Sequence, residues 1–358
     1  MKYDRTVSDE TLTRMVQHIE PTWTVSDATP ATGGHHIVYL LTVETETGTR
    51  DCVLKATPPG KDPMCDVEAR MLAIVAANTT MPVPEVFGVV DEHGDLPAPF
   101  FLASTLPGED YQRTELARVA DVDLETLARS CGRHLASLHD LDLVSGYGYV
   151  GVEYDRPLAG DRPSSNPDQL VVRNPTDDWK SCLRDSVEAI VEGLAETRFD
   201  NLVGGVEPAL DGRLDRLSGR FDPVVCRIDN SIDNLLVDPE TSEVTGFLDW
   251  EFQFAGTPAY DLAFVTHSMA GGAWAYVPGV PNHEATIRRG FLDGYREVGP
   301  GHVVEQYETH GECYELLALC HAMLNFETVM EQADATDEQR DGAAEALTDA
   351  VSVLCENQ

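Results

Sequence analysis

The chain has 358 residues, of which 42% are hydrophobic, so it is long enough to bury a sizeable core in two lobes. Its 62 Asp and Glu residues outnumber its 25 Lys and Arg residues and give a net charge of −37 at pH 7. This balance argues against binding to nucleic acid or to an anionic membrane surface, both of which attract basic proteins. No apolar run reaches the roughly 18 residues of a membrane span, and the start lacks a signal-like apolar stretch, so we expect a cytoplasmic protein.

The acidic residues are spread along the whole chain, and lysine is nearly absent. The only lysines are Lys2, Lys55, Lys61 and Lys180. This composition predicts a halophilic protein, from a high-salt cytoplasm in which salt screens the repulsion between carboxylates. Eight cysteines form no C-x-x-C pair, and several lie among apolar residues, which favours reduced, buried thiols over a zinc site.

The N-terminal third of the chain is rich in strand patterns and contains one helix pattern. The strands are predicted at residues 37–43, 50–56, 84–90 and 99–104, and the helix at 63–77. The pattern breaks at Leu106-Pro107-Gly108. We therefore expect an N-terminal lobe at residues 1–104 and a hinge at 105–110.

The remaining residues, 111–358, predict a larger C-terminal lobe that is mostly helical. Apolar stripes predict helices near residues 124–139, 183–194, 284–297, 311–331 and 337–355. Residues 223–252 are rich in strand patterns, and residues 151–178, rich in Pro, Asp, Arg and Asn, predict a long surface loop. This order of elements favours an α+β fold with a small β-rich lobe and a larger helical lobe.

Three polar residues stand out among the apolar strands of residues 223–252. Asp229 and, five residues later, Asn234 lie in a polar loop, and Asp249 follows the next hairpin. Taken singly, each residue is more typical of a turn or a hairpin cap. Taken together they fit phosphoryl transfer, which needs one carboxylate to orient the attacking hydroxyl. It also needs a carboxamide and a second carboxylate to hold the Mg²⁺ on the nucleotide phosphates.

This segment resembles the aminoglycoside phosphotransferase-like kinases, distant relatives of the protein kinases that include choline, homoserine, methylthioribose and fructosamine kinases. The family pattern is H-G-D-x-x-x-x-N, then I/L-D-W/F-E, then G-x-P-x-x-D-L-A. The chain matches it with Arg227-Ile228-Asp229 through Asn234, with Leu248-Asp249-Trp250-Glu251 and with residues 256–263, although Arg227-Ile228 replaces the usual His-Gly. The resemblance implies a bilobal protein-kinase-like fold. It also implies Asp229 as catalytic base, Asn234 and Asp249 as Mg²⁺ ligands and Asp261 as a buried structural acid.

The N-terminal lobe carries residues that suit the nucleotide. A kinase needs a cation on the phosphates that is held by a helix carboxylate. Lys55 on a predicted strand and Glu68 on the following helix fit these roles, with a surface lysine and a solvated glutamate as the alternatives. By resemblance, the turn at Gly33 and Gly34 would cover the phosphates. Backbone groups of Ser104 and Leu106 would meet the adenine edge.

The spacing between Asp249 and Asp261 is too short for a protein-kinase activation segment, so a small-molecule acceptor is favoured over a protein. We expect ATP- and Mg²⁺-dependent transfer of the γ-phosphoryl group to a hydroxyl of that molecule. The competing hypothesis is a catalytically inactive kinase-like module that binds a nucleotide, which rests on Arg227-Ile228 alone. The sequence leaves open the identity of the acceptor, the preference for ATP or GTP and the oligomeric state.

Overall fold

The structure is a computed structural model that describes residues 5–31, 36–61, 65–153, 155–251 and 253–356. The chain forms two compact units. The first comprises Met1–Pro107, Gly151–Val171 and Gly246–Phe252, and the second comprises Gly108–Val150, Val172–Thr245 and Gln253–Gln358. The first change of unit falls between Pro107 and Gly108, but two later segments return to the first unit. The predicted N-terminal lobe, which ends at residue 104, does not include these two segments.

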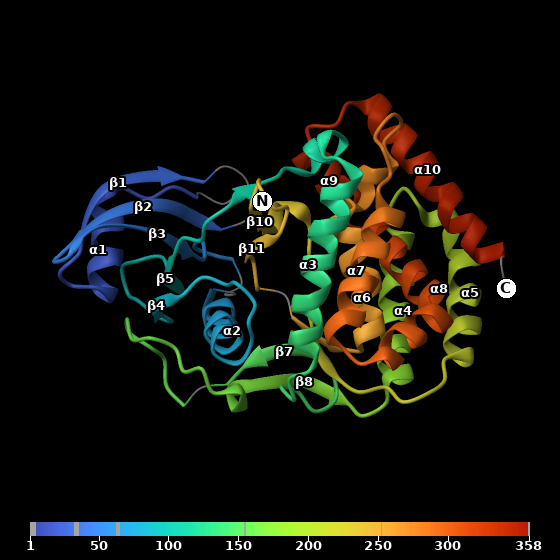
Figure 1. Cartoon of the computed structure of the whole chain (residues 1–358), viewed down its shortest axis with the longest axis horizontal. Helices are drawn as coiled ribbons and strands as arrows, with labels where there is room; N and C mark the ends of the chain where they lie inside the picture. Colours follow the sequence, from blue (N-terminus) through green and yellow to red (C-terminus); the bar gives the residue numbers. More distant parts are fainter. Residues whose placement is uncertain (1–4, 32–35, 62–64, 154, 252, 357–358) are drawn as a thin grey trace. The chain divides into compact units, whose positions relative to one another are not determined.

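The first unit is built on a five-stranded antiparallel sheet in the order β1-β2-β3-β5-β4 (Figure 1). The strands are β1 (Thr24–Pro30), β2 (Ile37–Thr45), β3 (Gly48–Ala56), β4 (Val86–Val90) and β5 (Phe100–Ser104), and the helices are α1 (Asp9–Ile19) and α2 (Cys65–Asn78). Alternate residues of β2 enter the core, as the hydrophobic pattern predicts. The sequence did not predict β1, because this strand has no fully buried residue and thus no alternation to detect.

The prediction of a long surface loop at residues 151–178 is wrong in part. The Val89 N–H donates to the Asp161 carbonyl at 3.1 Å, and the Gly160 N–H donates to the Val89 carbonyl at 2.9 Å, so this segment covers the edge of β4. Further along, β8 (Leu170–Thr176) is a strand. These pairings satisfy backbone groups of β4, which side-chain hydropathy does not report.

A buried ion pair fixes the same edge of the first unit. Arg70 of α2 donates two hydrogen bonds to the Asp91 carboxylate, both at 2.8 Å, and both side chains are almost fully buried. Paired bonds of this kind offset the cost of burying the two charges. The Asp91 carboxylate also accepts the Leu158 N–H at 2.5 Å and so ties residues 158–161 to the sheet.

The second unit is mostly helical, which together with the first sheet confirms the α+β fold class. Its helices are α3 (Asp121–His139), α4 (Trp179–Ala195), α5 (Val203–Arg216), α6 (Pro258–Met269), α7 (Glu284–Val298), α8 (Gly301–Leu324), α9 (Phe326–Gln332) and α10 (Asp337–Glu356). Figure 1 shows α3 and α7 side by side. Gly294 permits this close approach, because a Cβ there would lie 2.0 Å from the Arg129 carbonyl oxygen.

Short strands complete the structure and carry the segments of interest. They are β6 (Glu109–Asp110), β7 (Tyr147–Val152), β9 (Val224–Cys226), β10 (Leu235–Val237), β11 (Val244–Phe247) and β12 (Phe254–Gly256). One sheet has the order β11-β10-β6 and another the order β8-β7-β12-β9. None of the described helices combines the length and the hydropathy that a membrane crossing requires.

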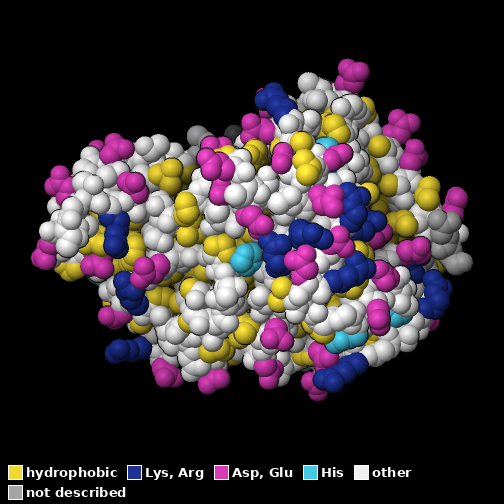
Figure 2. All heavy atoms as spheres, in the orientation of Figure 1, with side chains coloured by type: hydrophobic (Ala, Val, Ile, Leu, Met, Phe, Trp, Pro, Cys, Tyr) yellow, Lys and Arg dark blue, Asp and Glu magenta, His cyan; other side chains and the backbone are white. Residues whose placement is uncertain are grey.

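Carboxylates dominate the charged surface of both units, as Figure 2 shows for one face. Some are paired with arginine, such as Glu243 with Arg133 at 2.6 Å. However, 25 basic residues cannot neutralise 62 acidic residues, so most carboxylates repel one another through solvent.

We expect the melting temperature to rise between 0.05 and 2 M KCl, where the screening length falls from roughly 14 to 2 Å. Differential scanning calorimetry measures this rise. A neutral osmolyte at matched osmolality is the control, because it cannot screen charge and should not reproduce the full effect. A melting temperature that does not change with KCl would contradict the halophilic interpretation.

Candidate active site

A buried lysine in the first unit lies among three carboxyl groups. Lys55 of β3 places its Nζ 2.6 Å from Glu68 Oε2, 3.0 Å from Asp249 Oδ1 and 3.7 Å from Glu251 Oε1. The Lys55 side chain is only 12% exposed, so its pairing with Glu68 is not a surface contact. The structure therefore brings together three of the predicted site residues, although 194 positions separate Lys55 from Asp249.

Three further residues, Glu251, His36 and Lys61, extend this cluster. The His36 Nε2 lies 2.5 Å from Glu251 Oε2, and the Lys61 Nζ lies 3.0 Å from the same His36 nitrogen. Glu251 is the last residue of the Leu248-Asp249-Trp250-Glu251 motif, and this position could have indicated that it belongs to the site. Nothing in the local sequence marks His36 or Lys61 as partners, because their proximity arises only from folding.

The charges of the cluster depend on burial and on each other. Burial raises the pKa of Glu68, and Lys55 acts in the opposite direction. Burial works against the charged form of Lys55, but Glu68, Asp249 and Glu251 outweigh it and raise the Lys55 pKa well above its usual value. Burial also works against charge on Glu251, yet the hydrogen bond to His36 and the charge of Lys55 lower the Glu251 pKa to about 2.

The donor chemistry of this cluster fits Mg²⁺, the ion that the family resemblance implies. Carboxylate oxygens are the ligands that Mg²⁺ prefers, and three carboxyl groups surround one ammonium group. Among the described residues, no group of three or more His, Cys, Asp or Glu side chains is arranged to hold a metal ion. Mg²⁺ commonly uses one or two protein ligands together with phosphate and water oxygens.

The loop after β9 carries the other predicted pair, within the second unit. Asn234 donates from Nδ2 to the Asp229 Oδ2 at 3.2 Å, and the Ser231 N–H donates to the Asp229 Oδ1 at 3.0 Å. The Asp229 side chain is exposed, whereas the residues of β9 before it are buried. These two bonds orient an accessible carboxylate without burying it.

Asp261, at the start of α6, holds the backbone of this loop. Its carboxylate accepts the Arg227 N–H at 2.8 Å and the Ile228 N–H at 2.7 Å. Its Oδ2 lies 3.0 Å from His139 Nε2, whose other ring nitrogen lies 3.1 Å from the Tyr295 hydroxyl. Asp261 is fully buried, so it acts on the loop and not on a ligand.

The residue before Asp229 has a strained backbone. Ile228 has φ of +56°, and the Asp229 N–H donates to the Arg227 carbonyl at 2.7 Å, which closes a tight three-residue turn. The left-handed region costs a residue with a Cβ about 1–2 kcal/mol, and it is rarest for β-branched residues. Glycine, which the resembled family has at this position, would avoid that cost.

The remaining predicted residues concern the nucleotide. Gly33 and Gly34 lie outside the described residues. Ser104 is the last residue of β5, and its N–H donates to the Glu85 carbonyl at 2.9 Å. Leu106 follows β5 and is partly exposed.

The first unit with its buried Lys–Glu pair and the second with its Asp–Asn loop have the features of a protein-kinase-like fold. Residues 29–302 match the family described as "Phosphotransferase enzyme family". The match covers more than half of the chain, so the chain belongs to the phosphotransferase enzyme family.

Solved structures share this fold at low sequence identity. One is an aminoglycoside phosphotransferase, APH(4)-Ia, in a ternary complex with AMP-PNP and hygromycin B. It is 15% identical, with a TM-score of 0.58, and the match covers 97% of this chain and 100% of that one. Another is the GDP complex of aminoglycoside 2'-phosphotransferase-IIIa, 13% identical, with a TM-score of 0.58 and coverage of 97% and 99%.

One curated relative is "Probable acyl-CoA dehydrogenase IBR3" of Arabidopsis thaliana, 23% identical over 251 residues. The match covers 65% of this chain but only 26% of that protein, so the chain spans about a quarter of its length.

Glycine is normally less stabilising than alanine, but the strain at Ile228 predicts the opposite order at this position. Both Ile228→Ala and Ile228→Gly remove the side chain, but only glycine relieves the left-handed backbone. We expect Ile228→Gly to have the higher free energy of unfolding, by about 1 kcal/mol, as measured by urea titration in molar KCl.

The matched control is Val122 on α3, which is 68% exposed. There, Val122→Ala should be more stable than Val122→Gly by about 0.5–1 kcal/mol, the usual order in a helix. If the alanine variant is more stable than the glycine variant at residue 228 as well as at residue 122, the backbone of Ile228 is not strained.

Proposed function

We propose that this phosphotransferase transfers the γ-phosphoryl group of ATP, in the presence of Mg²⁺, to a hydroxyl group of a small molecule. The observation that carries the proposal is the position of Lys55 between Glu68 and Asp249 in the first unit. A buried cation held by a helix carboxylate, next to a carboxylate suited to a metal ion, is what nucleotide phosphates require.

The first unit would hold the nucleotide. Lys55 would bind the phosphates, and Glu68 would keep its ammonium group in place. The turn at Gly33 and Gly34 would cover the phosphates, and backbone groups of Ser104 and Leu106 would meet the adenine edge. The Ser104 N–H already donates to the Glu85 carbonyl. The Ser104 carbonyl is therefore the backbone group that would accept a hydrogen bond from adenine.

The second unit would supply the base. Asp229 would accept the proton of the acceptor hydroxyl as its oxygen bonds to the γ-phosphorus and the bond to the leaving ADP oxygen breaks. The hydrogen bond from Asn234 orients the Asp229 carboxylate for this step. Asn234 and Asp249 would hold the Mg²⁺, which when bound neutralises charge on the phosphates.

The alternative of an inactive nucleotide-binding module rests on Arg227-Ile228 in place of His-Gly. Asp261 holds the N–H groups of both residues, and the Asp229 carboxylate keeps its bonds to Ser231 and Asn234. The loop therefore tolerates the two replacements, which supports an active enzyme. A panel of hydroxylated metabolites and aminoglycosides, assayed for ADP release in molar KCl, tests activity directly.

Replacing Asp229 with alanine should remove the proton acceptor and leave ATP binding nearly intact. We expect the rate of phosphoryl transfer to fall by about 10²–10⁴-fold, measured with any acceptor that the panel identifies. Calorimetric titration of the variant with ATP controls for misfolding. An Asp229→Ala variant that works at the wild-type rate would show that another group is the base.

Replacing Asp249 with asparagine should weaken Mg²⁺-dependent binding of ATP, because a charged ligand of a hard cation is lost. Asn also tolerates the left-handed backbone of Asp249, whose φ is +59°, so the variant should keep its local fold. We expect affinity for Mg²⁺ and ATP together to fall on the order of tenfold or more, with a much smaller change without Mg²⁺. Equal losses with and without the ion would reject Asp249 as its ligand.

A further inference from the structure

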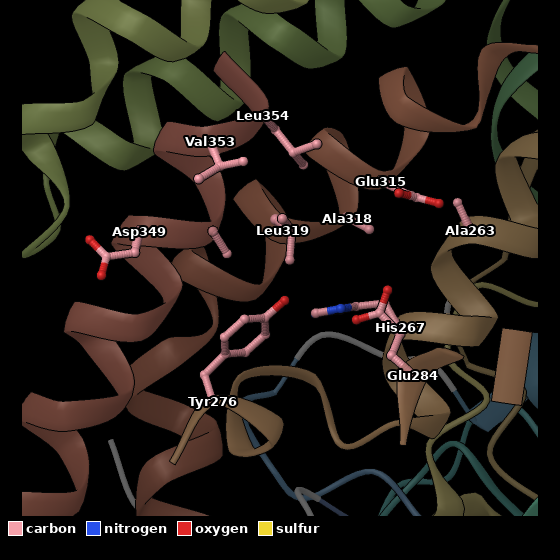
Figure 3. A pocket seen from close by; sticks show the side chains of 11 residues that line it. Ala263, His267, Tyr276, Glu284, Glu315, Ala318, Leu319, Asp349, Val353 and Leu354 are labelled. Carbon is pink, nitrogen blue, oxygen red and sulfur yellow. The ribbon is translucent and has the colours of Figure 1, made fainter. Parts of the chain in front are cut away.

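A cavity of about 400 Å³ lies within the second unit, between α6, α8, α10 and the short helix at Gly272–Tyr276 (Figure 3). Most of its lining is apolar and includes Ala318 and Leu319 of α8 and Ala350 and Val353 of α10. A volume of this size suits a small organic molecule, and an apolar lining favours an apolar one.

One polar side chain of the cavity is buried without a hydrogen bond. His267 of α6 is 8% exposed, and its Nε2 is a buried atom with no hydrogen-bond partner. Figure 3 shows the His267 ring directed into the cavity, near the Tyr276 hydroxyl. Burial, together with His321 and Arg288, lowers the His267 pKa to about 4, so the imidazole is neutral at neutral pH. A hydroxyl group can donate to or accept from such a nitrogen and thus suits either tautomer.

Two of the three carboxylates that line the cavity, those of Glu284 and Glu315, have partners. Arg288 donates to Glu284 at 2.5 Å and lies 3.2 Å from Glu315, which also accepts the Tyr307 hydroxyl at 3.0 Å. The Asp349 carboxylate points away from His267 in Figure 3. Glu284 and Glu315 therefore do not present free carboxylates to a polycation.

The wall of the cavity is joined to the catalytic loop. Ser268, next to His267 on α6, accepts the Asn230 N–H at 2.9 Å and donates to the Ile228 carbonyl at 3.4 Å. The helix that presents His267 to the cavity therefore also contacts the loop that carries Asp229.

We propose that this cavity binds the apolar body of the phosphoryl acceptor. The acceptor class is then a compact, mostly apolar molecule with the reacting hydroxyl and a second uncharged polar group for His267, rather than a polycationic sugar. This inference rests on the proposed function, because it assigns the cavity to the substrate of Asp229.

The first test measures binding to the full chain by calorimetry in molar KCl. The probe is 1,4-benzenedimethanol, an aromatic body with two hydroxyl groups, and we expect a dissociation constant in the millimolar range. Ala350→Leu, which fills the cavity from α10, should weaken binding by about tenfold or more. The matched control is Ala346→Leu, one turn earlier on α10 at a residue that does not line the cavity, and it should bind as the wild type does.

A comparison of two ligands tests the hydrogen bond to His267. The wild type should bind 4-methylbenzyl alcohol, which lacks one hydroxyl, several-fold more weakly than the diol. In His267→Leu this preference should disappear. Equal affinity of the Ala350→Leu and Ala346→Leu variants for the diol, or an absence of diol binding, would overturn the proposal.

The second test separates this inference from the proposed function. Wild-type protein should release ADP when the diol is the acceptor, and Asp229→Ala should bind the diol but phosphorylate it about 10²–10⁴-fold more slowly. If kanamycin or inositol is phosphorylated and the bound diol is not, the acceptor class is wrong and the proposed function stands. If the cavity binds the diol and no acceptor is phosphorylated, the proposed function fails and the acceptor role of the cavity fails with it.

Discussion

The chemistry of the second unit depends on one buried carboxylate, that of Asp261. A carboxylate at 0% exposure is stable only if hydrogen bonds replace its hydration, and here two backbone N–H groups and His139 do so. The same two N–H groups belong to the strained turn that precedes Asp229. The hydrogen bonds that stabilise the buried Asp261 carboxylate therefore also hold Ile228 in its unfavourable conformation, and both together fix the position of Asp229.

The first unit also buries a charged group, in this case a cation. Lys55 is a buried cation, and the nearby carboxyl groups of Glu68, Asp249 and Glu251 keep it charged. Asp249 takes part because residues 246–252 return to the first unit after the chain has passed through the second. The Leu248-Asp249-Trp250-Glu251 motif therefore lies in the first unit with Lys55, although the strands β9 and β10 that precede it belong to the second unit.

The sequence predicted those parts of the structure that leave a local pattern. The strands at residues 37–43, 50–56, 84–90 and 99–104 alternate or are continuously apolar, and Asp229, Asn234 and Asp249 stand out as polar groups beside apolar strands. The exposed strand β1 and the pairing of residues 158–161 with β4 left no such pattern, because backbone hydrogen bonds determine them. His36, Lys61 and the cavity around His267 were also missed, because each depends on contacts between residues far apart in the chain.

The net charge of the chain and the lining of its cavity differ in chemical character. If the net charge of −37 served to bind a cation, unpaired carboxylates should gather where a ligand can enter. Instead, Glu284 and Glu315 share Arg288, and the cavity beside them has an apolar lining with a neutral imidazole. The excess of carboxylates lies on the outer surface, where salt can screen it. The net charge is therefore a property of the surface, and the chemistry of the ligand must be inferred from the few polar atoms that the interior leaves unsatisfied.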